Sequence, residues 1–408
     1  MRILVICYEY PPVGGGGATF CEACCEALVQ SGHEVDVVTS GMADLPTFEQ
    51  RNGVDIHRVR CFRRHRYYAT SPELLTQVYP SYRKALELQL TQPYDVCHCH
   101  FVVPSGLTAY MLQKKTGLPY VLTAHGSDIP GYNPDRFSCL HRLIRPAWTR
   151  IMRASDAVTT PSRFLRGLIN RQIDIPVQVV PCGFDPISRD GVVRRNRLLV
   201  ASRVVERKGI QFLIRALEQI DTDWEICVAG DGPYLPEVKK LAAELSVRVN
   251  FLGFIPRDKL IRLYESARVF VFPSIQENFP LVLLEAMAGG CAIVTTSAPG
   301  CAEVVGDAAV KVKPGCPNAL REAVSRLLTD GREIERLGKL GAERIADLAW
   351  CRIIERYEAV FRGVAEIDES FGMNTRPPCN QVSSSFGLET LESLAERDSE
   401  PTSDDADS

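Results

Sequence analysis

Short apolar segments alternate with amphipathic segments of helical periodicity over most of the chain. The first strand is predicted at residues 3–8, a helix at about 18–31, and the next strand at 34–39. Strands that alternate with helices in this way form parallel sheets covered by helices on both faces. The same alternation predicts later strands at residues 96–101, 120–124, 198–202, 225–229, 249–252, 269–273 and 292–295, and helices at 107–116, 209–220, 234–245, 260–267, 280–288 and 344–362.

The alternation stops once and then starts again, which predicts two domains in a chain of 408 residues. Residues 186–197 lack periodicity and are predicted to be a linker. We expect two doubly wound α/β lobes, residues 1–185 and 198–343, that face a cleft where ligands bind. A final helix at 344–367 is expected to pack back on the first lobe. The Ser-rich, acidic tail at 368–408 is expected to be disordered.

Charge and cysteine content limit the classes of function. The net charge is −3, and residues 381–408 carry −7, which leaves +4 on the rest. A mildly basic body suits an anionic substrate, and nothing in the charge indicates a nucleic acid partner. The 15 scattered cysteines favour a reducing, cytoplasmic compartment. Neither a signal peptide nor a run of ~18 uncharged apolar residues is present, so no membrane span is expected.

A glycine-rich loop follows the first predicted strand, from Tyr10 to Gly17. Glycines let a backbone approach a ligand closely, and the start of the next helix presents free N–H groups. The loop therefore fits a phosphate site. It also fits a plain tight turn, and the dinucleotide fingerprint fails because its third glycine would fall at Thr19.

Charged residues mark the ends of two strands in the second half. Arg203 and Lys208 follow the strand at 198–202, where two cations beside a helix start suit a diphosphate. A solvated loop is the alternative. Glu277 precedes the helix that Pro280 begins, and Glu285 lies roughly 8 Å further along that helix. A carboxylate at this position can accept two hydrogen bonds from a vicinal diol such as a ribose. A capping acid plus an ordinary surface acid is the alternative, but Glu285 lies in an apolar run and needs a partner.

Taken in order, these pieces resemble the retaining glycosyltransferases of family 4, which have the two-lobed GT-B fold. The resemblance covers roughly residues 1–361, and its specificity lies in the order of pieces that are each weak. In the first half the matching pieces are Tyr10-Pro11-Pro12 with the glycine loop, Gly32-His33-Glu34-Val35, residues 95–100, Ala124-His125-Gly126-Ser127-Asp128, Pro161-Ser162 and residues 180–185. In the second half they are Arg203 with Lys208-Gly209, Gly230-Asp231-Gly232-Pro233, Phe251-Leu252-Gly253, and Glu277 with Glu285.

The resemblance implies a site for a nucleotide-diphosphate sugar. Arg203 and Lys208 match the cations that hold the donor diphosphate, and Glu285 matches the residue that holds the ribose hydroxyls. Glu277 and His125 match the groups near the reacting sugar and are the expected catalytic residues. The remaining donor-binding positions are the backbone amides of Asn278, Phe279 and Leu281 near sugar and phosphate, and Gly15 and Gly16 in the loop that shapes the acceptor side and the phosphate pocket.

Three positions depart from the family pattern. Pro280 stands where the family has a small residue or glycine, and it lacks an N–H that could bind phosphate. Gly300-Cys301 stands in place of two glycines before Glu303, and Cys182 replaces an asparagine before Gly183. These differences concern the donor sugar and leave the class unchanged.

The resemblance also implies the reaction, a hexosyl transfer that needs neither a metal nor a cofactor and serves polysaccharide biosynthesis. Retention by double displacement needs a carboxylate nucleophile, and the sequence assigns neither glutamate that role. We therefore expect front-face attack on the donor by a glycan, lipid-linked or small-molecule acceptor. A nucleotide-sugar epimerase of the same fold and a catalytically silent nucleotide-sugar-binding protein are the alternatives.

Several cysteines and acids tempt a metal or redox interpretation. The run Cys97-His98-Cys99-His100 lies on a predicted strand, which places only two candidate ligands on each face. Cys21, Cys24 and Cys25 lie in a helix that must pack on the sheet, so buried apolar roles are expected. Asp221 and Asp223 fall in a turn before a strand. We therefore expect no metal site.

Two arginine-rich segments raise the alternative of a peripheral contact with an anionic lipid, at the inner face of the membrane, or with an anionic acceptor. The second segment has helical spacing, which also fits a helix with one packed and one solvated face. The arginines are Arg58, Arg60, Arg63, Arg64 and Arg66 in the first segment and Arg142, Arg145, Arg150 and Arg153 in the second.

Overall fold

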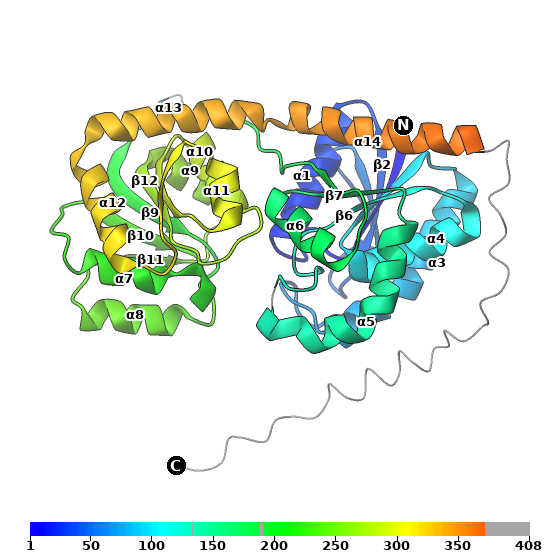
Figure 1. Ribbon diagram of the computed structural model, residues 1–408, viewed down its shortest axis with the longest axis horizontal. Helices are drawn as coiled ribbons and strands as arrows, with labels where there is room; N and C mark the ends of the chain where they lie inside the picture. Colours follow the sequence, from blue (N-terminus) through cyan, green and yellow to red (C-terminus); the bar gives the residue numbers. More distant parts are fainter. Residues whose placement is uncertain (133, 188–190, 372–408) are drawn as a thin grey trace, which may run out of the picture. The chain divides into compact units, whose positions relative to one another are not determined.

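The computed structural model describes residues 1–132, 134–187 and 191–371, which divide into two compact units (Figure 1). The division differs from the predicted lobes, because residues 125–132 and 160–185 group with the second half of the chain. The predicted acidic tail lies almost entirely outside the described residues. The first unit comprises residues 1–124, 134–159 and 358–371, and the second comprises 125–132, 160–187 and 191–357.

The first unit is built on a mainly parallel sheet, in which β3 and β4 form an antiparallel hairpin. Asn52 and Gly53 close this hairpin with positive φ angles of 50° and 83°, as a two-residue turn of the mirror type requires. This hairpin was not predicted, although Asn-Gly is the usual sequence signal for one. The strands are β1 (Arg2–Cys7), β2 (Glu34–Ser40), β3 (Phe48–Arg51), β4 (Val54–Val59), β5 (Val96–His100), β6 (Tyr120–Thr123) and β7 (Ala157–Thr160).

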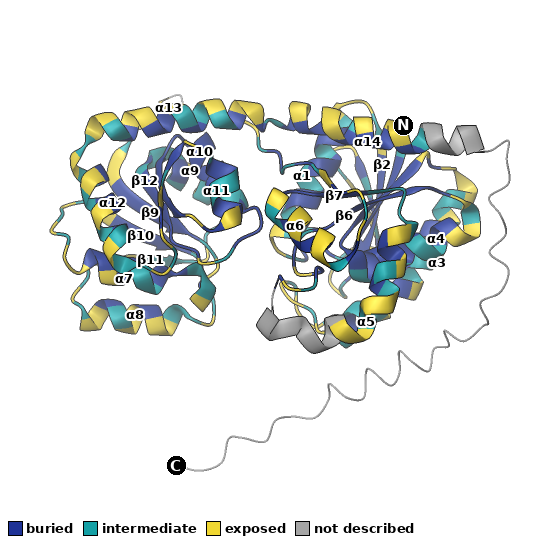
Figure 2. Cartoon of the chain, viewed as in Figure 1, coloured by how far each residue is buried: buried dark blue, intermediate teal, exposed yellow. Residues whose placement is uncertain are grey.

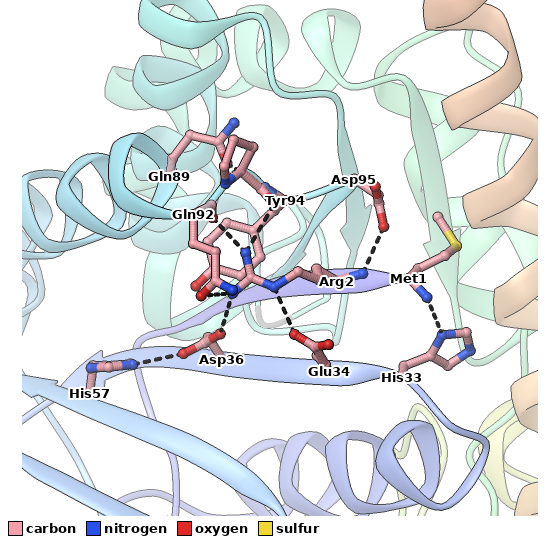
Figure 3. A network of polar contacts seen from close by, with 11 residues as sticks. Met1, Arg2, His33, Glu34, Asp36, His57, Gln89, Gln92, Tyr94 and Asp95 are labelled. Atoms are coloured by element: carbon pink, nitrogen blue, oxygen red, sulfur yellow. Dashed lines mark hydrogen bonds and ion pairs between the residues drawn. The ribbon is translucent and has the colours of Figure 1, made fainter.

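These strands lie in the order β3-β4-β2-β1-β5-β6-β7. Without β3 this is the Rossmann order 3-2-1-4-5-6, and its switch point falls between β1 and β5. Helix α1 lies on one face of the sheet and α3 on the other (Figures 1 and 3). The helical segments are α1 (Gly16–Gln30), α2 (Ser71–Thr76), α3 (Val78–Thr91), the turn η1 (Val102–Gly106), α4 (Leu107–Thr116) and α5 (Pro134–Ala154).

Polar side chains hold together the amino edge of the first sheet (Figure 3). Arg2 on β1 reaches Glu34 on β2, with 2.8 Å between Nε and Oε2, and donates to the carbonyl oxygen of Gln92 at 2.7 Å. His57 on β4 lies 2.9 Å from Asp36 on β2. Three strands and the end of α3 are thus joined at the edge opposite to the one where ligands of such sheets bind.

The second unit has a fully parallel sheet in the order β11-β10-β9-β12-β13-β14. This is again the Rossmann order, with the switch point between β9 and β12. The strands are β9 (Arg195–Ala201), β10 (Glu225–Ala229), β11 (Asn250–Gly253), β12 (Ala267–Phe272), β13 (Ala292–Thr296) and β14 (Ala309–Val312). The two-residue strand β8 (Gln178–Val179) precedes them in the chain.

The strands of this sheet are largely buried, and the helices around it carry both buried and exposed residues (Figure 2). Leu213 on α7 and Leu327 on α12 belong to a continuous core with Val200 and Val271 of the sheet. Burying such side chains contributes about 1.5–3 kcal/mol each. The helical segments are α6 (Arg163–Gln172), η2 (Glu206–Lys208), α7 (Ile210–Leu217), α8 (Leu235–Glu244), α9 (Arg257–Ser266), α10 (Leu281–Ala288), α11 (Pro299–Val305), α12 (Pro317–Thr329), α13 (Gly331–Asp347) and α14 (Trp350–Phe371), whose residues 358–371 belong to the first unit.

Two boundary predictions were wrong. Strand β9 begins at Arg195, inside the predicted linker 186–197, because the buried Arg197 bonds Glu225 on the next strand at 2.8 Å. The predicted final helix is two helices, α13 and α14. They separate because Leu348 O accepts from Phe184 N at 2.9 Å and Trp350 N donates to Asp185 at 3.0 Å.

Candidate functional site

The loops that follow β9 and β12 lie at the switch point of the second sheet, where open α/β sheets bind ligands. They hold Lys208 and Glu277, two of the predicted site residues. Gly209, at φ +73°, brings the loops together, since a Cβ there would lie 2.1 Å from the carbonyl oxygen of Pro273. Gly300, in the Gly300-Cys301 pair that departs from the family pattern, allows a similar close approach. A Cβ added there would lie 2.2 Å from the carbonyl oxygen of Asn278.

Lys208 and Glu277 form an ion pair, with 2.5 Å between Nζ and Oε1. Ser274, which is fully buried, donates from Oγ to the same carboxylate oxygen at 2.7 Å. Lys208 Nζ also lies 5.1 Å from the centre of the Phe272 ring. The predicted diphosphate-binding cation and the predicted sugar-side acid are therefore direct partners.

Glu285 is buried on α10 and has two partners from α9. Tyr264 donates its hydroxyl to Oε2 at 3.0 Å, and Arg257 donates to Oε1 at 3.2 Å. Burial raises the pKa of the Glu285 carboxyl, while Arg257 and the Tyr264 hydrogen bond counteract that rise. Glu285 lies in apolar surroundings and needs hydrogen-bond partners. Tyr264 and Arg257 of the same unit provide them.

Asn278 uses its side chain to join two other segments. Its Nδ2 donates to the carbonyl oxygen of His125 at 2.8 Å, and its Oδ1 accepts from Ser162 Oγ at 2.5 Å. Phe279 is buried and Leu281 is half-buried. The amides of Leu281 and Val282 lie in the first turn of α10, where a helix provides no acceptor four residues earlier, whereas the Leu283 amide donates to Pro280 O at 3.1 Å. Pro280 is the N-cap of this helix and contributes no N–H.

His125 precedes a turn that Asp128 closes by accepting from the amides of His125 and Gly126, at 3.1 and 2.8 Å. Burial lowers the pKa of the His125 imidazole to about 3. The ring is therefore neutral at physiological pH, so it can accept or donate a hydrogen bond but carries no charge. Arg203 is exposed in the loop that follows β9.

Gly15 and Gly16 belong to the first unit, where helix α1 begins directly after Gly15. A Cβ at either position would meet no atom within 4 Å. Gly17 differs, since a Cβ there would lie 2.5 Å from the Phe101 ring. The two predicted ligand-facing glycines therefore border open space, while a neighbouring glycine is required by packing.

Comparison with known proteins agrees with this arrangement. The model of Glycosyl transferases group 1 matches residues 189–344, and that of Glycosyltransferase Family 4 matches residues 14–187. An uncharacterised glycosyltransferase of Methanocaldococcus jannaschii is 32% identical over 359 residues, which cover 81% of this chain and 90% of that protein. The chain belongs to the group 1, family 4 glycosyltransferases.

Solved structures confirm the GT-B fold of this glycosyltransferase. Sucrose-phosphate synthase from Thermosynechococcus elongatus superposes with a TM-score of 0.73 at 23% identity, covering 92% of this chain and 100% of that one. HepE of Anabaena in complex with UDP superposes with a TM-score of 0.70 at 19% identity, covering 91% and 100%.

The cysteines and histidines that suggest a metal site are buried inside the glycosyltransferase. Cys97, His98, Cys99 and His100 are all buried on β5, and His98 lies 2.8 Å from the hydroxyl of Thr123. The three cysteines of α1 are buried against the sheet, as predicted. Within the described part of the chain, no three His, Cys, Asp or Glu side chains are placed to hold a metal ion.

The arginine-rich segments of the glycosyltransferase divide into structural and exposed residues. Arg58 was wrongly grouped with surface residues, because it is buried and donates to Pro11 O at 2.8 Å and to Glu49 at 2.6 Å. Arg60 and Arg64 are exposed beside exposed aromatic rings. On α5 the packed and solvated faces are as predicted, with Trp148, Ile151 and Met152 buried and Arg142, Arg145, Arg150 and Arg153 exposed.

Sequence reasoning missed four residues that contact the predicted site. Tyr264 and Arg257 hold Glu285, Ser274 holds Glu277, and Ser162 holds Asn278. Ser162 is part of the Pro161-Ser162 piece of the family resemblance but was given no role, and Ser274 directly follows Pro273, which ends the predicted strand at 269–273. Tyr264 and Arg257 lie on a helix with no local feature that marks them.

Proposed function

We propose that this enzyme is a retaining, metal-independent hexosyltransferase that moves a sugar from a nucleotide diphosphate to a glycan, lipid-linked or small-molecule acceptor. The observation that carries the proposal is the position of Lys208 and Glu277 on facing loops at the switch point of the second sheet, with Glu285 on the helix that follows. The cation Lys208 suits a diphosphate, the acid Glu277 suits the sugar, and the buried carboxylate of Glu285 suits the ribose.

In this proposal the donor diphosphate lies against Lys208, Arg203 and the first amides of α10. Negative charge grows on the diphosphate as the bond to the sugar breaks, and positioned cations and N–H groups stabilise that charge. They supply the positive charge that a divalent metal supplies in other transferases. The ribose hydroxyls donate to Glu285, whose other partners, Tyr264 and Arg257, orient it.

Retention is proposed to follow from attack on the same face that the diphosphate leaves. The acceptor oxygen forms the bond to the anomeric carbon while the bond from that carbon to the phosphate oxygen breaks. The acceptor proton passes to the departing diphosphate. The neutral imidazole of His125 and the carboxylate of Glu277 form hydrogen bonds with the sugar in this step. A covalent glycosyl adduct on Glu277 would contradict it.

A hexose attached to UDP is the first donor to test. HepE, a structural neighbour, was crystallised with UDP, with UDP and glucose, and with UDP-glucose. Thermal-shift measurements with UDP, GDP and ADP identify the base, because a ligand that binds the native state raises its melting temperature. The donor sugar is then identified by transfer assays, and NMR of the product gives the anomeric configuration.

The outcomes of these assays separate three functions. A transferred sugar with the donor's anomeric configuration supports the proposal, and an inverted product contradicts it. Conversion of the donor alone into an epimer would make the chain an epimerase. Nucleotide binding without turnover on any acceptor would favour a silent binding protein. Undiminished transfer in the presence of a chelator is expected, and its loss would contradict metal independence.

A cytoplasmic location with contact at the inner membrane face is part of the proposal. The thirteen cysteines whose side chains the structure describes are free thiols, which suits a reducing compartment. Among the described residues, every helix is too short or too polar to cross a membrane. Exposed Arg60 and Arg64 lie on a segment that also exposes Phe62, Tyr67 and Tyr68, a combination that suits an anionic lipid surface. Flotation with vesicles of 30% phosphatidylglycerol should recover wild type and lose R60E/R64E.

A further inference from the structure

The charge of Lys208 is already satisfied without a donor. Its side chain is 14% exposed and that of Glu277 is 9% exposed, so the ion pair between them is largely shielded from water. The contact is short, at 2.5 Å, and Ser274 adds a hydrogen bond to the same oxygen of Glu277. Any diphosphate that is to bind Lys208 must therefore replace a carboxylate that is already in place.

We propose that Glu277 competes with the diphosphate for Lys208 and thereby makes the site select a nucleotide sugar over the free nucleoside diphosphate. This inference rests on the proposed function, because it requires Lys208 to bind the donor diphosphate. It assigns Glu277 a role in donor selection and product release in addition to its place beside the sugar.

The selection follows from what replaces Lys208 as the partner of Glu277. A buried carboxylate that loses its cation and gains no new partner is strongly unfavourable. When a nucleotide sugar binds, sugar hydroxyls donate to Glu277, and Lys208 turns to the diphosphate. When the free nucleoside diphosphate binds, no hydroxyl takes that place, and two anions share one small site.

Ser274 keeps Glu277 in position through this exchange. Its hydroxyl lies 2.7 Å from Glu277 Oε1 and 3.1 Å from the carbonyl oxygen of Arg207. Its own carbonyl oxygen accepts from Thr296 at 2.6 Å, so the residue is fixed to the neighbouring strand. A carboxylate held by a rigid hydroxyl stays at the site when Lys208 leaves it. After transfer, Glu277 pairs with Lys208 again and weakens the hold on the product.

The test is a set of calorimetric affinities for the full chain. Titrations use whichever of UDP, GDP and ADP binds wild type most tightly, and the glucose conjugate of that nucleotide. E277Q keeps the shape and removes the charge, so the free nucleoside diphosphate should bind about tenfold more tightly, which corresponds to about 1.4 kcal/mol. The glucose conjugate should bind no more tightly than before, so the preference for the sugar conjugate falls.

Two controls separate the ion pair from general charge removal. Glu206 is exposed in the same loop as Lys208, and E206Q makes the same change in net charge. E206Q should shift both affinities by less than about twofold, in keeping with the weakness of exposed charges. In a K208M background the gain from E277Q should be clearly smaller, because the competing pair no longer exists and only the repulsion between Glu277 and the diphosphate remains to be relieved.

Unchanged or weaker nucleoside diphosphate binding in E277Q would overturn the inference, as would an equal gain in E206Q or a gain that is just as large in the K208M background. A thermal melt that matches wild type shows that E277Q is folded; if it does not match, E277D, which keeps the charge on a shorter side chain, should show no gain. Failure of wild type to bind any of the three nucleotides would instead refute the proposed function.

Discussion

The sheets of the two units share one order of six parallel strands and differ in the residues that lie at the switch point. In the second unit the loops after β9 and β12 carry an ion pair between Lys208 and Glu277. In the first unit the loop after β1 carries glycines. The nearby Arg58 is buried and donates hydrogen bonds to the carbonyl oxygens of Tyr10 and Pro11 in that loop. The same topology therefore places charged side chains at one switch point and glycine backbone at the other.

This difference shows where function is encoded in a doubly wound sheet. The order of strands decides where a ligand can bind, and the residues of two loops decide which ligand it is. Charged side chains in the second unit suit the diphosphate that both donor and product contain. The open space at Gly15 and Gly16 in the first unit suits a group that approaches the backbone closely.

Removing the cation of the second unit should have the largest effect. K208M is expected to lower kcat by about 10²–10³-fold, the usual cost of losing one group that stabilises a developing anion. The matched control is K240M on α8, where Lys240 is exposed and paired only at 3.8 Å with Glu244. Steady-state kinetics of both variants decide the point, and a loss below fivefold in K208M would remove Lys208 from the mechanism.

The glycines of the first unit offer a test of shape rather than charge. G17A should lower the free energy of unfolding by about 1–3 kcal/mol, because its methyl group meets the Phe101 ring. G15A and G16A should change it by less than about 0.5 kcal/mol, yet lower the rate of transfer, since the methyl group occupies the space of the ligand. Denaturant unfolding and kinetics separate the two outcomes. Full activity in both G15A and G16A would leave this loop without a role.

The sequence predicted much of the fold and part of the site, because periodicity and motif order are local patterns along the chain. Alternating periodicity predicted both α/β units, and motif order predicted the family and the positions of Lys208, Glu277 and Glu285. Local pattern could not reveal that Lys208 and Glu277 bond to each other, because that contact joins loops 69 residues apart. It also missed Tyr264 and Arg257, whose roles arise only when α9 packs beside α10.

The same limit explains the errors in the first unit. Arg58 lies among other arginines in the sequence and was assigned to the surface with them. Its position on β4 directs it inward, where Pro11 O and Glu49 compensate its charge. Composition describes a segment as basic, but only the register of a strand decides which arginine is buried.

Arg58 therefore gives the next prediction. R58M should lower the free energy of unfolding by about 1–3 kcal/mol, because it removes the arginine that donates to Tyr10 O and Glu49 and one of the two arginines that donate to Pro11 O. Arg60 lies just beyond the end of β4 with an exposed side chain, and R60M should change stability by less than about 0.5 kcal/mol. Chemical denaturation of both variants gives the answer. Equal stability of R58M and R60M would mean that the glycine loop does not depend on Arg58.

Replacing Glu285 should have the smallest effect on stability. The sign of the change in melting temperature is the informative result. Burial raises the pKa of the Glu285 carboxyl, so the folded state binds this proton more tightly than the unfolded state does. The contribution of the group is most favourable below its unfolded pKa and is lost as pH rises through the folded one. E285Q should therefore melt at a higher temperature than wild type at pH 7, and the difference should vanish on acidification.

The same variant should bind the nucleotide about tenfold more weakly, because a neutral amide accepts weaker hydrogen bonds from ribose hydroxyls than a carboxylate does. Melting curves across pH, with and without nucleotide, measure both effects on one sample. Opposite signs are what a charge retained for binding predicts, since such a group costs stability in the empty site. If E285Q were instead less stable at pH 7 and unaltered in nucleotide affinity, Glu285 would serve the packing of α9 against α10, and the charged site of the second unit would reduce to Lys208, Glu277 and Arg203.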